Sequence, residues 1–192
     1  EGRAKLIPEV SNRNRFWKIL STFTIRRLKP DMVKLPPKYR KLISLEMHPD
    51  QQSLYDHLAG EAKAAIDREL RKSDEEINMG VISKHLWNLR FAATIPCDLP
   101  LEQNPKLNKT VEICRQIEVQ GEKAIIFSGL REMQKAIVQR LNQERIENMP
   151  IFASTTPPKR LAKIDEFSTN GHVALVTGLN VLNRGFTITA AN

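Results

Sequence analysis

The sequence contains no run of apolar residues long enough to cross a bilayer, which takes about 20 residues. Its first ten residues also lack the apolar stretch of a signal peptide, so we expect no membrane partner. The two cysteines, Cys97 and Cys114, do not have the paired spacing of a disulfide framework or a zinc site. These absences favour a protein of the reducing cell interior, in the cytoplasm or nucleoid of a bacterium or the nucleus of a eukaryote.

Candidate metal ligands and aromatic residues are also few. The chain has four histidines, His48, His57, His85 and His172. Their spacing is not that of metal ligands and no acidic pair adjoins them, so we expect solvated or packed side chains and predict no metal site. Trp17 and Trp87 fall on the apolar faces of expected helices, and we expect them to anchor a core rather than to stack on bases.

Positive charge is abundant and unevenly placed. Residues 1–41 hold twelve Lys and Arg against three acidic residues, whereas residues 42–104 hold six against eleven and residues 105–192 hold twelve against eight. A basic arm ahead of a nearly neutral body is typical of a protein with a polyanionic partner, most often nucleic acid. The arm residues considered for this role are Arg13, Arg15, Lys18, Arg26, Arg27 and Lys29. The alternative is that they form an ordinary solvated helix face.

The first hundred residues have mainly helical patterns. Apolar residues at helical spacing predict a helix near residues 13–26, and the segment from Tyr39 to Leu45 fits an extended strand. Two further helices are expected within residues 49–103, the first beginning at His48–Asp50. We expect Ser73–Glu76 to be a polar break or the N-cap of the second.

Residues 104–192 alternate between strand and helix patterns. Short apolar runs predict strands at residues 123–128, 150–153 and 172–177, with amphipathic helices before and between them. The first run is nearly uninterrupted, which is typical of a strand covered on both faces. We expect Gly121 to end the helix before it. This order predicts an α/β fold, a parallel sheet with flanking helices and right-handed crossovers.

Hydroxyl groups and glycines follow the expected strands, at the edge where parallel sheets bind their ligands. Hydroxyls and free backbone amides hold phosphate oxygens without reading bases. We therefore expect Ser128, Thr156 and Thr177, with the nearby Arg160, to track a nucleic-acid strand. The alternative is that the hydroxyls cap turns and helices and that Arg160 is a solvated helix residue.

Several segments resemble, in order, the motifs of one protein family. Gln51-Gln-Ser-Leu-Tyr55 resembles a Gln-x-x-Leu-Tyr motif, and Leu86-Trp-Asn-Leu-Arg90 resembles a Leu-x-x-Leu-Arg helix. The other matching segments are the paired arginines and Leu-Pro-Pro-Lys within residues 23–38, Pro105-Lys106-Leu107, motif IV at residues 125–128, the Arg-x-x-x-Ile-x-x-Phe of residues 160–167 and motif V at residues 176–192. In this order they resemble the C-terminal part of the motor in Swi/Snf-type helicase-like ATPases, within helicase superfamily two.

The resemblance implies a RecA-like C-terminal lobe at residues 104–192, truncated before motif VI. A basic connecting segment at residues 1–45 and a helical protrusion at residues 46–103 would precede it. It also implies a parent protein whose first RecA-like lobe, on the same chain, holds most of the ATP and Mg²⁺, and whose other partner is nucleic acid, most often double-stranded DNA. The 192 residues contain no Gly-x-x-x-x-Gly-Lys-Ser/Thr and no Asp-Glu-x-His, so we place no catalytic residue in them.

Motif V departs from the usual pattern of the family. Asn183 stands in place of a glycine and Thr187 in place of an asparagine. Arg184-Gly185 instead resembles the Arg-Gly of DEAD-box proteins, and Asn180 falls where those proteins carry a nucleotide-contacting aspartate. The resemblance therefore implies that Asn180, Arg184 and Gly185 couple the lobe to the nucleotide. The alternative for Gly185 is a turn cap, and the preference for double-stranded DNA stays open.

Two classes of function remain. The first is the second motor lobe of a DNA-stimulated ATPase that moves along nucleic acid. In that case we expect these 192 residues alone not to hydrolyse ATP. The second is a non-catalytic module that kept the RecA-like lobe for binding nucleic acid or protein. A Gln-x-x-Gly-Arg-x-x-Arg-like stretch beyond residue 192 would favour the motor.

Overall fold

The chain divides into two units, residues 1–43 and residues 44–192. The computed structural model describes residues 13–25, 39–73, 76–96, 99–182, 188 and 191. The first unit contains α1 (Arg13–Phe23), which confirms the helix predicted near this position. Trp17 packs edge-to-face on Phe16, with ring centroids 5.9 Å apart, and keeps 45% of its surface exposed. The prediction that Trp17 anchors a core is therefore wrong.

The segment predicted as a strand, Tyr39–Leu45, has no regular secondary structure. The side chains of Tyr39 and Leu42 are almost fully exposed. No described strand pairs with this segment, and an extended segment becomes a strand only when a neighbour satisfies its backbone groups. The apolar residues here predicted burial that the described part of the fold does not supply.

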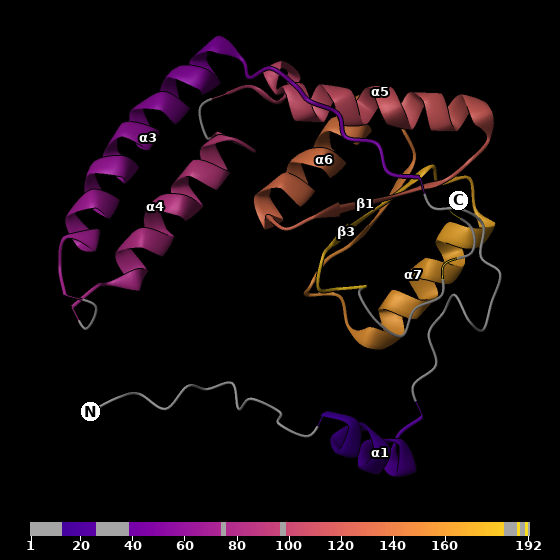
Figure 1. Ribbon diagram of the computed structural model, residues 1–192. Coiled ribbons are helices and arrows are strands. Elements are labelled where there is room, and N and C mark those ends of the chain that lie inside the picture. Colours follow the sequence, from indigo (N-terminus) through magenta and orange to yellow (C-terminus); the bar gives the residue numbers. More distant parts are fainter. Residues whose placement is uncertain are drawn as a thin grey trace. The chain divides into compact units, whose positions relative to one another are not determined.

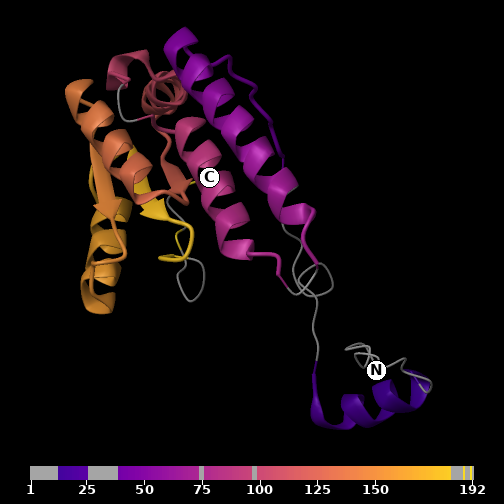
Figure 2. The ribbon, with the colours of Figure 1, turned by 90° about the vertical axis from the view of Figure 1, so that its left-hand side faces the viewer.

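The second unit begins with two helices that lie side by side, α3 (Pro49–Leu70) and α4 (Met79–Ala92) (Figures 1 and 2). Pro49 is in the first turn of α3, where its missing N–H costs nothing, and this confirms the predicted start. The N-cap of α4 is Asn78, whose side chain accepts a hydrogen bond from the Gly80 amide at 3.0 Å. Residues 73–76 therefore fall in the break between the two helices, which confirms the first alternative, and the alternative that they cap α4 is wrong.

The connection between α3 and α4 is fixed by Glu69. Its carboxylate accepts hydrogen bonds from the Lys72 ammonium at 2.7 Å and from the Asn78 backbone amide at 2.9 Å. These two donors, Lys72 first, lower the pKa of Glu69. Glu69 therefore holds the end of α3 beside the start of α4.

The remainder of the unit is a parallel α/β layer, as predicted. Its strands are β1 (Ala124–Ser128), β2 (Asn148–Ile151) and β3 (Ala174–Gly178), in the order β1-β3-β2. The helices are α5 (Pro105–Gln120), preceded by a short 3₁₀ turn at Leu101–Gln103, α6 (Arg131–Gln143) and α7 (Pro157–Thr169). Gly121 ends α5 in the left-handed conformation, φ 67°, as predicted.

Alternate side chains of the central strand serve two cores. Ala174 and Val176 of β3 pack with α5 and α6, whereas Leu175 packs with Phe167 of α7 on the other face. Figure 1 shows α5 and α6 on one side of the sheet and α7 on the other. The strand covered on both faces is β3, because β1 lies at the edge of the described sheet and leaves Phe127 47% exposed. The predicted burial of residues 123–128 is therefore wrong.

Two buried amide side chains fix the end of α4, one to α3 and the other to the start of the α/β layer. Gln51 of α3 donates a hydrogen bond to the Ala92 carbonyl at the end of α4, at 2.8 Å. Asn104 donates to the Thr94 carbonyl at 3.0 Å, and its oxygen accepts from the amides of Lys106 and Leu107 at the start of α5. The Gln-x-x-Leu-Tyr motif thus contributes a structural hydrogen bond.

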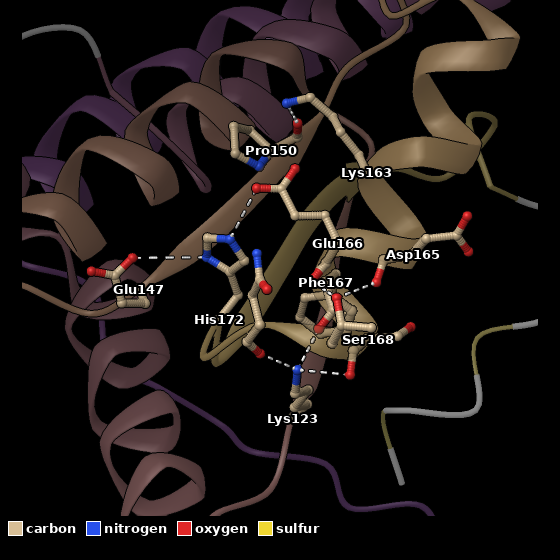
Figure 3. A network of polar contacts seen from close by, with 11 residues as sticks. Lys123, Glu147, Pro150, Lys163, Asp165, Glu166, Phe167, Ser168 and His172 are labelled. Atoms are coloured by element: carbon tan, nitrogen blue, oxygen red, sulfur yellow. Dashed lines mark hydrogen bonds and ion pairs between the residues drawn. The ribbon is translucent and has the colours of Figure 1, made fainter.

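Polar side chains close the amino edge of the sheet (Figure 3). Lys123, which precedes β1, donates to the backbone carbonyls of Phe167 and Asn170 at the end of α7. His172, which precedes β3, lies 3.8 Å from a carboxylate oxygen of Glu147 and 3.8 Å from one of Glu166. These contacts join loops within the layer, so a ligand site is better sought at the opposite, carboxyl edge. No helix in the described residues is both long and apolar enough to span a membrane.

Candidate nucleic-acid interface

The carboxyl ends of the three strands lie level with one another. Ser128 of β1 is in register with Gly178 of β3, and Ile151 of β2 is in register with Thr177. The loops that follow the strands therefore leave the sheet along one edge, as the sequence predicted.

A cavity of about 320 Å³ lies at this edge. Its wall includes Arg90 of α4, Ser128 and Gly129 after β1, Gln134 of α6, and Gly178 and Asn180 after β3. The wall offers a guanidinium, a hydroxyl and amide groups, and its described residues include no carboxylate. This set of groups suits phosphate oxygens, whereas Mg²⁺ requires oxygen ligands that usually include a carboxylate. The site therefore fits a phosphate and not a resident metal ion.

Two glycines let side chains approach the strand ends closely. A Cβ atom on Gly129 would lie 2.5 Å from Nη2 of Arg90, and one on Gly178 would lie 3.1 Å from Nε2 of Gln134. Gln134 is nearly buried, and its amide also donates a hydrogen bond of 2.9 Å to the Ser128 carbonyl. Each glycine thus leaves the space that a neighbouring polar side chain occupies.

Ser128 combines a structural contact with a place on the cavity wall. Its hydroxyl oxygen accepts a hydrogen bond from the Leu130 amide at 3.3 Å, at the entry to α6. The side chain is partly exposed and lines the cavity with Asn180, which is exposed on the loop after β3. The structure thus brings together a residue expected to bind nucleic acid and one expected to bind nucleotide.

Thr177 does not present its hydroxyl to a ligand. The side chain is fully buried, and its Oγ1 donates a hydrogen bond of 2.9 Å to the Ile151 carbonyl on the neighbouring strand. In this structure Thr177 joins β3 to β2, which corrects the expectation that it contacts a phosphate. A hydroxyl after an apolar run can point to either side of a strand end, and here it points inward.

Arg160 is also occupied within its own lobe. Its guanidinium donates to three backbone carbonyls, those of Thr155 at 2.7 Å, Ala153 at 3.1 Å and Val181 at 3.2 Å. Arg160 thus joins the loop after β2 to the loop after β3. This contact set corrects both earlier interpretations, the phosphate ligand and the solvated helix residue.

The remaining predicted residues do not line the cavity. Thr156 is exposed at the N-cap of α7 and makes no side-chain capping hydrogen bond. Arg15 and Lys18 are exposed on α1, in the other unit. The other predicted residues cannot be placed in this way. Arg26, Arg27, Lys29, Arg184 and Gly185 lie outside the described residues, as does the side chain of Arg13.

Sequence reasoning missed two polar residues of the cavity wall, Arg90 and Gln134. Arg90 closes the Leu-x-x-Leu-Arg motif, so the motif itself was the available signal. Gln134 carried no signal, because a glutamine in an amphipathic helix is unremarkable until the tertiary contact is known.

Comparisons with known proteins agree with this architecture. Residues 106–192 match the helicase conserved C-terminal domain family. A SWI/SNF-related regulator of chromatin from Arabidopsis thaliana, subfamily A member 3-like 1, is 29% identical over 73 residues, which are 38% of this chain and 8% of that protein. The chain therefore spans less than a tenth of that relative.

Solved structures share the fold at low sequence identity. The Sulfolobus solfataricus SWI2/SNF2 ATPase C-terminal domain matches with a TM-score of 0.65 and 21% identity, over 76% of this chain and 65% of that one. The C-terminal part of the Fun30 ATPase domain matches with a TM-score of 0.69 and 16% identity, over 82% of this chain and 73% of that one. The Sulfolobus solfataricus SWI2/SNF2 ATPase core in complex with double-stranded DNA matches with a TM-score of 0.69 and 22% identity, over 94% of this chain and 40% of that one.

These matches bear on the lobe and on its fold. The matched family covers the strand-end cavity except for Arg90, and the structural match that covers 94% of this chain includes most of the helical pair as well. Residues 106–192 are thus similar to the helicase conserved C-terminal domain family, and the chain shares the RecA-like fold of the C-terminal lobe of SWI2/SNF2 ATPases.

Proposed function

We propose that this chain is the second motor lobe of a DNA-stimulated ATPase that couples ATP hydrolysis to movement along nucleic acid, with double-stranded DNA as its partner. The observation that carries the proposal is the strand-end cavity, where a guanidinium, a hydroxyl and amide groups meet without a described carboxylate. Contacts of this kind hold a nucleic-acid backbone and do not depend on its sequence. The match to a SWI2/SNF2 ATPase core in complex with double-stranded DNA supports the choice of partner.

The proposal assigns different tasks to different parts of the chain. Residues 104–192 act as the lobe, residues 46–103 as the helical protrusion and residues 1–45 as the basic connecting segment. In the parent protein ATP and Mg²⁺ are bound mainly by a first RecA-like lobe on the same chain. Because its proposed partner is the nucleic acid of the cell, the parent protein is proposed to be intracellular.

Asn180, Arg184 and Gly185 are proposed to couple the lobe to the nucleotide. Asn180 is exposed at the cavity wall, five residues before Gly185 in the chain. A positive charge at residue 184, facing the first lobe, would favour the closed arrangement with ATP bound. If Arg184 instead only pairs with an acidic residue on its own surface, that ion pair contributes at most about 1 kcal/mol.

Nucleic-acid binding tests the proposal directly. The 192-residue chain is titrated against labelled duplex DNA, single-stranded DNA and duplex RNA of mixed sequence at several salt concentrations. We expect sequence-independent binding, strongest for duplex DNA, with log K falling by roughly 0.9 per phosphate contact for each unit of log salt. The absence of salt-dependent binding to all three probes would contradict the proposal.

Hydrolysis separates a motor lobe from a binding module. The chain alone should not hydrolyse ATP, because its 192 residues contain no phosphate-binding loop. In the parent protein Arg184→Ala should lower DNA-stimulated turnover at least tenfold, about 1.4 kcal/mol of barrier, with little change in the melting temperature. A parent protein that binds DNA without any stimulated turnover would identify the chain as an interaction module instead.

A further inference from the structure

Arg90 reaches the strand-end cavity from a different element than the other polar groups of its wall. It lies in the last turn of α4, whereas the other polar groups of the wall come from the α/β layer. Its Nη2 atom occupies the space over Gly129, where a Cβ atom would lie only 2.5 Å away. The helical pair therefore contributes the guanidinium of this cavity.

The guanidinium has no charge partner among the described residues. No carboxylate of these residues lies within 4.0 Å of it, and in the described part of the chain Arg90 makes no side-chain hydrogen bond. Within the described ranges, the guanidinium lies over the ring of Trp87, whose centroid is 5.5 Å from Cζ of Arg90. Trp87 is 51% exposed, so the prediction that it anchors a core is wrong.

Trp87 and Gly129 together hold the guanidinium in place. A cation over the face of a tryptophan ring is attracted by the ring electrons, and this attraction leaves the N–H donors free. Gly129 leaves open the volume into which Nη2 projects. Arg90 thus lines the same cavity as Ser128 and Asn180.

We propose that Arg90 binds a backbone phosphate of nucleic acid at the strand-end cavity, so that the helical pair takes part in the nucleic-acid interface. The proposal rests on the proposed function and adds a residue and an element to it. The planar fork of arginine suits two oxygens of one phosphate. None of the described residues that line the cavity is acidic, so no carboxylate there competes with the phosphate for the guanidinium.

Charge removal on α4 tests the proposal, with a matched control. Arg90→Gln and Lys84→Gln each remove one positive charge from the same helix, and Lys84 is exposed and does not line the cavity. The 192-residue chain is titrated by fluorescence anisotropy against a fluorescein-labelled DNA duplex of mixed sequence. We expect Arg90→Gln to weaken binding three- to tenfold and to reduce the salt slope by about 0.9, the loss of one phosphate contact. Lys84→Gln should stay within twofold with an unchanged slope.

Gly129→Ala provides a second, independent variant. The added methyl group would displace Nη2 of Arg90 without removing any charge, and the φ angle of Gly129 is not in the left-handed region. We expect Gly129→Ala to weaken DNA binding at least threefold in the wild-type background and less than 1.5-fold in the Arg90→Gln background. Circular dichroism and the melting temperature of each variant show that the fold is kept. Equal effects in both backgrounds would overturn the proposal.

The outcomes distinguish the two hypotheses. If the wild-type chain binds duplex DNA with a salt-dependent affinity, and Arg90→Gln matches Lys84→Gln, the role of Arg90 is wrong and the proposed function stands. If the wild-type chain shows no salt-dependent binding, the proposed function fails and the role of Arg90 fails with it. A parallel titration with a fluorescent ATP analogue identifies the phosphate source, and a loss confined to the nucleotide would overturn the assignment to nucleic acid.

Discussion

The hydroxyl of Thr177 donates a hydrogen bond of 2.9 Å to the carbonyl of Ile151, and the Thr177 side chain is fully buried. The bond crosses from β3 to β2 at the carboxyl ends of the strands, beside the loops that form the cavity wall. A buried polar group of this kind is expensive to leave without its partner. Thr177 therefore acts on the site by holding two strand ends together.

Thr177→Val removes the hydroxyl and keeps nearly the same volume. We expect the free energy of unfolding to fall by about 1–3 kcal/mol, because the Ile151 carbonyl loses its buried donor. Urea denaturation measures this change, with Thr169→Val as the control, since that hydroxyl is exposed on α7. A loss of DNA affinity with unchanged stability would instead restore Thr177 as a phosphate contact.

The fold was predictable from the sequence where local pattern and tertiary burial agree. The strands and their parallel pairing followed from apolar runs that alternate with amphipathic helices, and Gly121 ends α5 where the sequence placed it. The segment Tyr39–Leu45 failed as a strand because a partner strand is a property of the fold and not of the segment.

The site was predictable as an edge of the sheet, but not as a set of side-chain contacts. Ser128 and Thr177 both follow apolar runs, yet one lines the cavity and the other is buried. Arg160 and Arg90 both lie on helices, yet in the described part of the chain only Arg160 donates hydrogen bonds to backbone carbonyls. Which way a side chain points at a strand end or helix end depends on neighbours more than 20 residues away along the chain.

Arg160→Lys tests the joining of two loops. Lysine keeps the charge and loses the planar fork that reaches three carbonyls, so we expect a loss of about 1–2 kcal/mol in stability. Hydrogen exchange should rise at the amides of Thr155 and Val181, which are hydrogen-bonded within the two loops. Lys159→Gln, at the exposed neighbouring position, is the control. Unchanged exchange at both amides would mean that the loops keep their positions without Arg160.

Cys114 predicts a dependence of stability on alkaline pH. Burial, with a smaller contribution from Glu118, raises the pKa of the Cys114 thiol to about 11, from about 9.0 in the unfolded chain. The unfolded chain therefore loses this proton first as the pH rises, so stability falls between about pH 9 and pH 11. Relative to Cys114→Ala, the wild-type chain should lose about 2 kcal/mol between pH 8 and pH 10.5 in urea denaturation. Parallel pH profiles of the two proteins would show that the buried thiol does not titrate in this way.

The basic arm gives the last prediction, because it forms a unit apart from the lobe. Residues 1–43 carry twelve Lys and Arg against three acidic residues, and the described Arg15 and Lys18 are exposed on α1. Exposed positive charges strengthen binding to a polyanion by releasing its counterions. Deleting residues 1–43 should therefore weaken duplex DNA binding at least tenfold at low salt and reduce the salt slope.

The deletion needs a control for folding and a measurement that separates the two units. Circular dichroism and thermal melting of residues 44–192 show whether the helical pair and the α/β layer are intact. Because the whole chain would make more phosphate contacts than residues 44–192, its affinity should fall more steeply with salt, so the difference between the two chains should shrink at high salt. If residues 44–192 bind with the affinity and slope of the whole chain, the arm is a solvated surface and the nucleic-acid interface lies entirely on the second unit.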